Sequence, residues 1–112
     1  MYKIQFTEPA EEDLLSLVRY ISEVLKSPTA AKNLLLEIEQ QITLLELMPF
    51  SCSLVLDDYL ASKGIRSLLV KNYQVFYTIN ECENIISIIR VLYARRDWAH
   101  LLENTTENTE DK

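Results

Sequence analysis

The chain contains very little glycine, cysteine or histidine, and these shortages exclude several kinds of site. Its 112 residues include a single glycine, Gly64, so there is no glycine-rich phosphate loop and no dinucleotide-binding fingerprint. The two cysteines, Cys52 and Cys82, match no metal-ligand spacing, and the only histidine is His100. We therefore expect no disulfide framework, no bound metal and no cofactor, but two incidental thiols in a reducing compartment.

Long hydrophobic runs are also absent. No apolar run reaches the roughly 18 residues that span a bilayer, and the N-terminus lacks the apolar segment of a signal peptide. The sequence thus predicts a cytoplasmic protein with no membrane partner. Its length predicts one domain over residues 1–102 with a single hydrophobic core. Residues 103–112 are acidic and contain no apolar side chain, so we expect a disordered tail.

The net charge of −6 is unevenly distributed along the chain. Residues 1–61 contain 4 basic and 10 acidic residues, residues 62–102 contain 6 and 3, and residues 103–112 contain 1 and 4. A basic segment between two acidic ones can bind phosphate locally, although long-range attraction to nucleic acid would be weak.

The first half of the chain predicts a strand followed by a helical hairpin. Residues 2–6 alternate between apolar and polar side chains, as in a strand with one buried face. Apolar residues then recur at three- and four-residue steps over about 8–26 and 28–48, which predicts two amphipathic helices. Thr7 and Ser27 are the expected N-caps. Because the break between the helices is short, they should pack antiparallel.

The second half predicts three strands joined by short turns. After an irregular connection over residues 50–63, strands are expected at residues 65–70, 73–79 and from Ile85 onward, with a short helix over residues 97–102. Short turns favour antiparallel pairing. The order β-α-α-β-β-β predicts an α+β fold in which the hairpin covers one face of a curved antiparallel sheet of three to four strands.

Arginines gather at the end of the last strand. The run from Ile85 is apolar and β-branched, as expected of a central strand, and it carries Arg90, Tyr93, Arg95 and Arg96. Guanidinium groups at a strand exit are suited to binding an anion such as phosphate. The alternative is that these arginines pair with the chain's many carboxylates.

Six short segments, in this order, match a known family over roughly residues 2–102. They are Phe6-Thr-Glu-Pro-Ala-Glu-Glu-Asp-Leu14, Ser27-Pro-Thr-Ala-Ala31, Leu45-Glu-Leu-Met-Pro49, Gly64-Ile-Arg66, Asn72-Tyr-Gln-Val-Phe-Tyr77 and Arg90-Val-Leu-Tyr-Ala-Arg-Arg-Asp-Trp98. On these segments the chain resembles the RelE/ParE superfamily of small bacterial toxins from type II toxin–antitoxin modules.

This resemblance implies a toxin that arrests growth until a cognate antitoxin neutralises it. A heterotetramer with the antitoxin is one expected assembly, and plasmid stabilisation is one expected role. Members of the superfamily follow one of two mechanisms. Some cleave messenger RNA on the ribosome, and others poison DNA gyrase without catalytic residues of their own.

A metal-free RNA nuclease requires a base for the 2′-OH, cations for the phosphorane and an acid for the leaving oxygen. Under that mechanism the resemblance assigns catalytic roles to four residues, Arg66, Tyr93, Arg95 and Arg96. Four others are expected to bind the substrate phosphate or the antitoxin, namely Lys63, Lys71, Gln74 and Arg90. For the two lysines the alternative is that they are simply solvated.

The chain also departs from the nuclease pattern. Gln74 stands where nuclease members commonly carry an arginine, Arg95 fits the last basic position only with a shift of one residue, and His100 lies beyond the strand. Clustered arginines favour mRNA cleavage slightly, while Gln74 favours a gyrase poison, and a decayed toxin that only binds antitoxin is a third reading. Arg90 and Tyr93 have an odd spacing, which predicts opposite faces of a regular strand.

Overall fold

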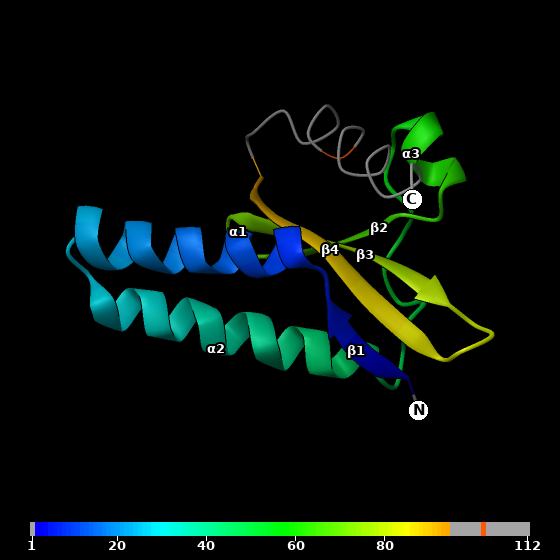
Figure 1. Ribbon diagram of the computed structural model, residues 1–112, viewed down its shortest axis with the longest axis horizontal. Coiled ribbons are helices and arrows are strands. Elements are labelled where there is room, and N and C mark those ends of the chain that lie inside the picture. The colour runs from blue at the N-terminus through cyan, green and yellow to red at the C-terminus, as the bar shows by residue number, and fades with distance from the viewer. Residues whose placement is uncertain (1, 95–101, 103–112) are drawn as a thin grey trace.

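The computed structural model describes residues 2–94 and Leu102, and it has a helical hairpin packed against a four-stranded sheet (Figure 1). Its elements in chain order are β1 (Lys3–Phe6), α1 (Glu8–Arg19), the π-helix η1 (Tyr20–Val24), α2 (Pro28–Leu45), α3 (Asp58–Ser62), β2 (Arg66–Val70), β3 (Tyr73–Asn80) and β4 (Ile85–Tyr93). The sheet order is β1-β4-β3-β2. The predicted α+β architecture is therefore confirmed.

Antiparallel pairing is confirmed for the three C-terminal strands, but β1 joins the sheet differently. It pairs parallel to β4, with Lys3 opposite Ile85 and Phe6 opposite Ile88. The reason is topological, since a strand separated from its neighbour by a helical crossover can run parallel to it. Because β4 lies between β1 and β3, it is the central strand that its composition predicted.

The α1–α2 hairpin begins at Thr7, which is hydrogen-bonded to β4. The Thr7 side chain accepts a hydrogen bond from Ala10 N at 3.4 Å, and its hydroxyl is 3.1 Å from the carbonyl oxygens of both Ile88 and Ile89. Thr7 is therefore the predicted cap and also joins α1 to β4. Ser27 occupies the predicted N-cap position of α2 but makes no capping hydrogen bond through its side chain.

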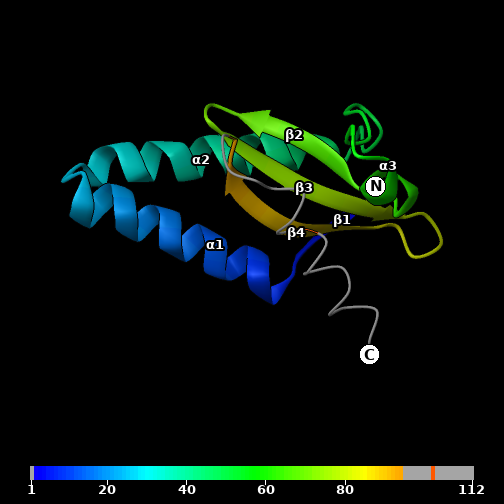
Figure 2. The ribbon, with the colours of Figure 1, turned by 90° about the horizontal axis from the view of Figure 1, so that it is seen from above.

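The helix predicted over residues 8–26 changes form at Tyr20. From there η1 makes five-residue turns, in which Leu25 N donates to Tyr20 O at 3.1 Å. Figure 2 shows the two helices diverging from the tip of the hairpin toward the sheet. Of all the helices in the described part of the chain, none is long and apolar enough to cross a membrane.

Apolar side chains fill both sides of the sheet. The larger core lies between the hairpin and the sheet and includes Leu17, Ile38 and Tyr77. A second core on the other face is formed by six buried residues: Val55, Leu60, Ile65, Phe76, Leu92 and Leu102.

The prediction of an irregular connection over residues 50–63 was wrong at its end. Asp58–Ser62 forms α3, because Asp57 accepts a hydrogen bond from Leu60 N at 3.0 Å and caps the helix. Leu60 then contributes to the second core. The helix expected over residues 97–102, apart from Leu102, and the acidic tail 103–112 lie outside the described residues.

Candidate functional site

Arg66, at the start of β2, contacts the segment that precedes α3. Its Nη1 donates to the Cys52 carbonyl at 2.6 Å, and its guanidinium carbon lies 4.9 Å from the centre of the Phe50 ring. Tyr77 is opposite Arg66 in the sheet and donates from its hydroxyl to Pro49 O at 2.9 Å. Burial, followed by a hydrogen bond with the Cys52 thiol, raises the pKa of the Tyr77 phenol. Together Arg66 and Tyr77 hold the segment 49–52 against the sheet.

Arg90 forms a forked ion pair with Asp13 of α1. Its Nε lies 2.6 Å from Asp13 Oδ2 and its Nη2 lies 2.9 Å from Oδ1. Val91 N also donates to Oδ2, at 3.0 Å. This arrangement follows from the topology, because β1 ends opposite Ile88 and leaves the next part of the β4 edge without a strand partner. Asp13 accepts the hydrogen bond that the Val91 N–H would otherwise give to a neighbouring strand, and its pair with Arg90 joins α1 to the sheet.

Tyr93 faces the hairpin at the end of β4. It is opposite Tyr73, and the two rings meet edge to face with their centres 5.6 Å apart. Burial raises the pKa of the Tyr73 phenol, and the nearby phenols of Tyr93 and Tyr20 raise it further. Gln74 is next to Tyr73 in the strand and therefore points to the other face. There its Oε1 accepts a hydrogen bond from the Ser67 hydroxyl at 2.9 Å.

The predicted catalytic residues that the structure describes do not converge. In the sheet register Arg66 is opposite Tyr77, and Tyr93 is opposite Tyr73. Because Tyr73 and Tyr77 are four residues apart on β3, Arg66 and Tyr93 are separated by roughly 13 Å along the strand direction. They also lie on strands separated by β3. Arg90 is held at the opposite edge by Asp13. The other predicted catalytic residues, Arg95 and Arg96, lie outside the described part of the chain, as does His100.

The two loop lysines have different surroundings. Lys63 follows α3, and its Nζ lies 5.4 Å from the centre of the Tyr59 ring. Lys71 lies in the turn between β2 and β3, where its backbone has a left-handed φ of 54°. Lys71, unlike Lys63, lines a cavity between this turn and the hairpin.

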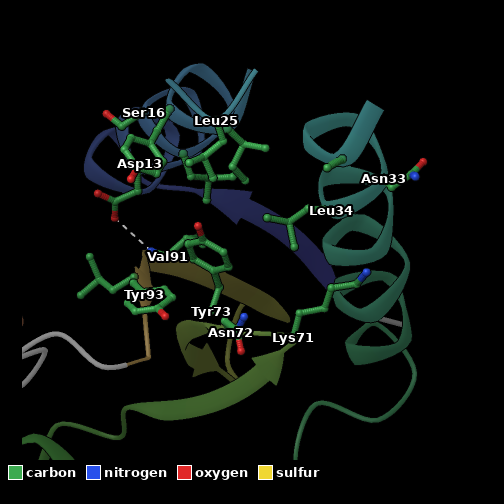
Figure 3. A pocket seen from close by; sticks show the side chains of 15 residues that line it. Asp13, Ser16, Leu25, Asn33, Leu34, Lys71, Asn72, Tyr73, Val91 and Tyr93 are labelled. Carbon is green, nitrogen blue, oxygen red and sulfur yellow. Dashed lines mark hydrogen bonds between the residues drawn. The ribbon is translucent and has the colours of Figure 1, made fainter. Parts of the chain in front are cut away.

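An open cavity of about 980 Å³ lies where the diverging helices meet the end of the sheet (Figure 3). We call it the hairpin groove. Its lining includes Tyr20, Leu25 and Leu34 from the hairpin side and Lys71, Tyr73 and Tyr93 from the sheet side. Among the predicted site residues within the described part of the chain, only Lys71 and Tyr93 line it. Sequence analysis missed the groove because Tyr20 and Leu25 look like ordinary positions of a continuous helix.

The groove has the chemistry of a binding site. It combines apolar walls with three phenols, from Tyr20, Tyr73 and Tyr93, and the ammonium group of Lys71. Within residues 2–94 and at Leu102, no cluster of three His, Cys, Asp or Glu side chains could hold a metal ion.

The solved structures that share this fold include three toxin–antitoxin systems. The chromosomal ParDE toxin–antitoxin system of P. aeruginosa aligns at 20% identity with a TM-score of 0.66, covering 85% of this chain and 98% of that one. A chain of the E. coli RelBE toxin–antitoxin complex aligns at 14% identity with a TM-score of 0.59, covering 86% of this chain and 100% of that one. The RelBE2 toxin–antitoxin complex of Mycobacterium tuberculosis aligns at 20% identity with a TM-score of 0.51, covering 82% of this chain and 96% of that one. No curated protein matches the sequence.

The sequence itself carries the family assignment. The profile described as the ParE toxin of the type II toxin–antitoxin system, parDE, matches residues 4–98. This range contains the hairpin, β2, β3, β4, all of β1 except Lys3, and every buried residue of the two cores except Leu102. The chain therefore belongs to the ParE toxin family of type II toxin–antitoxin systems.

Proposed function

We propose that this toxin arrests growth by binding DNA gyrase in the cytoplasm, without cleaving RNA, and that a cognate antitoxin neutralises it. Membership of the ParE family supports the gyrase target, because the gyrase-poisoning branch of the superfamily needs no catalytic residues of its own. The antitoxin partner is supported by the solved structures of similar fold, which are toxin–antitoxin systems.

The observation that carries the proposal is the dispersion of the expected nuclease residues. Cleavage without a metal needs several groups within hydrogen-bond reach of one phosphate. Arg66 is instead bound to Cys52 O, Arg90 is bound to Asp13, and Tyr93 lies roughly 13 Å along the sheet from Arg66. The two arginines thus act as structural ties.

Messenger RNA cleavage is the second candidate, and one observation favours it. Tyr93 and Lys71 line the same open groove, and Tyr93 is 39% exposed, so a phenol and an ammonium group face one surface. A phenol can stack on a base or transfer a proton.

Expression of the toxin in a bacterial host, with DNA and protein synthesis followed by pulse labelling, separates the two. We expect DNA synthesis to fall first, with messenger RNA still full length. Tyr93→Phe is the matched variant, because it removes the phenolic oxygen and keeps the ring. Under our proposal Tyr93→Phe still arrests growth.

An early fall in protein synthesis with truncated messenger RNA, abolished by Tyr93→Phe, would establish the nuclease and overturn the proposal. A chain that arrests nothing but still binds the antitoxin would be a decayed toxin.

A further inference from the structure

We infer that the toxin associates with a second copy of itself through the outer edge of β2. The contact would bring Leu69 of one copy opposite Leu69 of the other across a two-fold axis, with an uncharged apolar segment beside it. This inference goes beyond the proposed function and does not depend on the gyrase target.

The outer edge of β2 is paired over only part of its length. β2 is the last strand in the sheet order β1-β4-β3-β2, and Figure 2 shows it as the outermost strand. The connection before α3 covers its first residues. There Leu54 forms an isolated bridge with Arg66, and Ser67 N donates to Ser53 O at 3.3 Å. Within residues 2–94 and at Leu102, no strand continues this pairing along the rest of the edge.

Leu69 therefore has an outward-facing peptide. Residues of an antiparallel strand alternate between bonding to one neighbouring strand and pointing away from it. Because Ser67 N points away from β3, the N–H and C=O of Leu69, two residues further on, point away from β3 as well. Among the described residues neither group has a backbone partner. Unpaired strand edges of this kind are templates for another strand.

A second copy supplies the matching strand. When two identical strands pair antiparallel across a two-fold axis, the residue on the axis is opposite itself. With Leu69 on that axis, its N–H donates to the carbonyl of Leu69 in the other copy, and its own carbonyl accepts the reciprocal bond. This is the hydrogen-bonded pair of an ordinary antiparallel ladder, so the two sheets would join into one.

Exposed apolar side chains lie on and beside this edge. Leu69 itself is 61% exposed, although natural edge strands are usually protected by charged side chains. The segment before α3 adds four more exposed residues, which are Leu47 at 69%, Met48 at 64%, Phe50 at 51% and Leu54 at 42%. We call these five residues the edge patch. Grouped apolar exposure marks interaction sites.

The fold holds the segment that carries most of the edge patch by its backbone. Pro49 O accepts a hydrogen bond from the Tyr77 hydroxyl at 2.9 Å, and Cys52 O accepts one from Arg66 at 2.6 Å. The Phe50 ring lies 4.9 Å from the guanidinium carbon of Arg66, beside the start of β2. Because main-chain carbonyls make these bonds, the apolar side chains stay available for another surface. A preorganised surface also loses little conformational entropy on binding.

The edge patch suits contact between two acidic chains. Each copy has a net charge of −6, so two copies repel each other at long range. Residues 47–56 nevertheless contain no charged residue, whereas charged residues make up 25% of the chain. A two-fold interface places the same surface on both sides, which requires a surface that does not repel itself. The edge patch meets this requirement.

The area is that of a small specific interface. A large apolar side chain presents on the order of 150–200 Å² when fully exposed, so the five partly exposed side chains offer roughly 400–600 Å² per copy. Specific interfaces cover at least about 500 Å² on each partner. We therefore expect a reversible dimer with a dissociation constant on the order of 10 µM.

Sedimentation velocity of the full-length toxin, freed of antitoxin, tests the inference. We expect the wild type to shift from monomer to dimer between about 1 and 200 µM. Leu69→Glu and Leu69→Lys each place like charges opposite each other, so each alone should raise the dissociation constant about tenfold or more. An equimolar mixture of the two variants places a carboxylate opposite an ammonium group and should restore dimers.

Leu15→Glu is the matched control, because Leu15 is 62% exposed on α1, outside the edge patch. It should change the dissociation constant by less than about twofold. Phe50→Asp tests the apolar segment beside the strand and should raise the dissociation constant about fivefold or more. Unchanged thermal melting of each variant keeps loss of folding separate from loss of association.

A wild-type toxin that stays monomeric at about 200 µM would overturn the inference. A dimer that persists in both Leu69 variants would overturn it as well, because the contact would then lie elsewhere. Variants that stay monomeric even when mixed would contradict the pairing of Leu69 with itself. Loss of antitoxin binding in Leu69→Glu, with a monomeric wild type, would assign the edge to the antitoxin instead.

Discussion

Asp13 concentrates three hydrogen bonds on one carboxylate, and it does so at the point where the sheet loses a strand. The exposed fractions of the Arg90 and Asp13 side chains are 17% and 14%, so the pair is largely withdrawn from water. Removing Asp13 takes away the carboxylate that forms the forked pair with Arg90 in this largely buried position, and such a loss costs more than the pair itself contributes. Arg90 is thus better understood as part of the fold than as a ligand for phosphate.

Asp13→Ala should therefore lower the free energy of unfolding by about 2–4 kcal/mol. Urea denaturation of the purified chain measures this, and Glu12→Ala, at an exposed neighbouring position, is the control with an expected change below about 0.5 kcal/mol. Equal effects of the two substitutions would show that the forked pair contributes nothing special.

Tyr77 gives the fold a dependence on alkaline pH. Its pKa is raised above the usual value of about 10, so below that pH the phenol is protonated in both the folded and unfolded states. As the pH rises further, the unfolded chain loses the proton while the folded chain keeps it, and the free energy of unfolding falls.

Tyr77→Phe should lower stability by about 1 kcal/mol at pH 8, through loss of the bond to Pro49 O, and should make the decline above about pH 10 shallower than in the wild type. Urea denaturation of both proteins at a series of alkaline pH values measures the two slopes. Parallel slopes would contradict the assigned role of Tyr77.

At the scale of elements, two irregularities set the geometry. The register of β3 against β4 shifts between Phe76 and Tyr77, which leaves Ile89 as an extra residue in β4. Bulges of this kind redirect side chains. The other irregularity is η1, which ends α1 with wider turns and brings Tyr20 and Leu25 to the groove. Periodicity cannot predict either feature, because the apolar spacing is equally compatible with regular elements.

Beyond residue 94 the structure describes Leu102, and this side chain belongs to the second core. Leu102 is fully buried and packs with Phe76, Leu92 and Leu60 on the sheet face away from the hairpin. Leu102→Ala should destabilise the protein by about 2–4 kcal/mol through the cavity that it leaves. Thermal or urea unfolding measures it, with Leu56→Ala as an exposed control. An effect no larger than that of the control would mean that the second core tolerates loss of this side chain.

At the scale of the whole molecule, sequence patterning predicted the order of the four strands and the two long helices and the central place of β4, but not η1 or α3. The parallel pairing of β1 was not predicted, because alternation in residues 2–6 reports a buried face and not a strand direction. The arrangement of the site residues was even harder to predict from the sequence. Arg66 and Tyr93 look like partners when residue types are read along the chain, yet the register separates them, and Arg66 is bound to Cys52 O.

The central claim is that the toxin binds gyrase and does not cut RNA, and a plasmid assay with purified components tests it most directly. Purified bacterial gyrase is mixed with supercoiled plasmid, ATP and the toxin, and cleaved plasmid is measured against toxin concentration. We predict that cleaved complexes accumulate with wild type and equally with Tyr93→Phe. Gyrase that is unaffected by the wild-type toxin, at concentrations that destroy messenger RNA in a translation extract, would contradict the account.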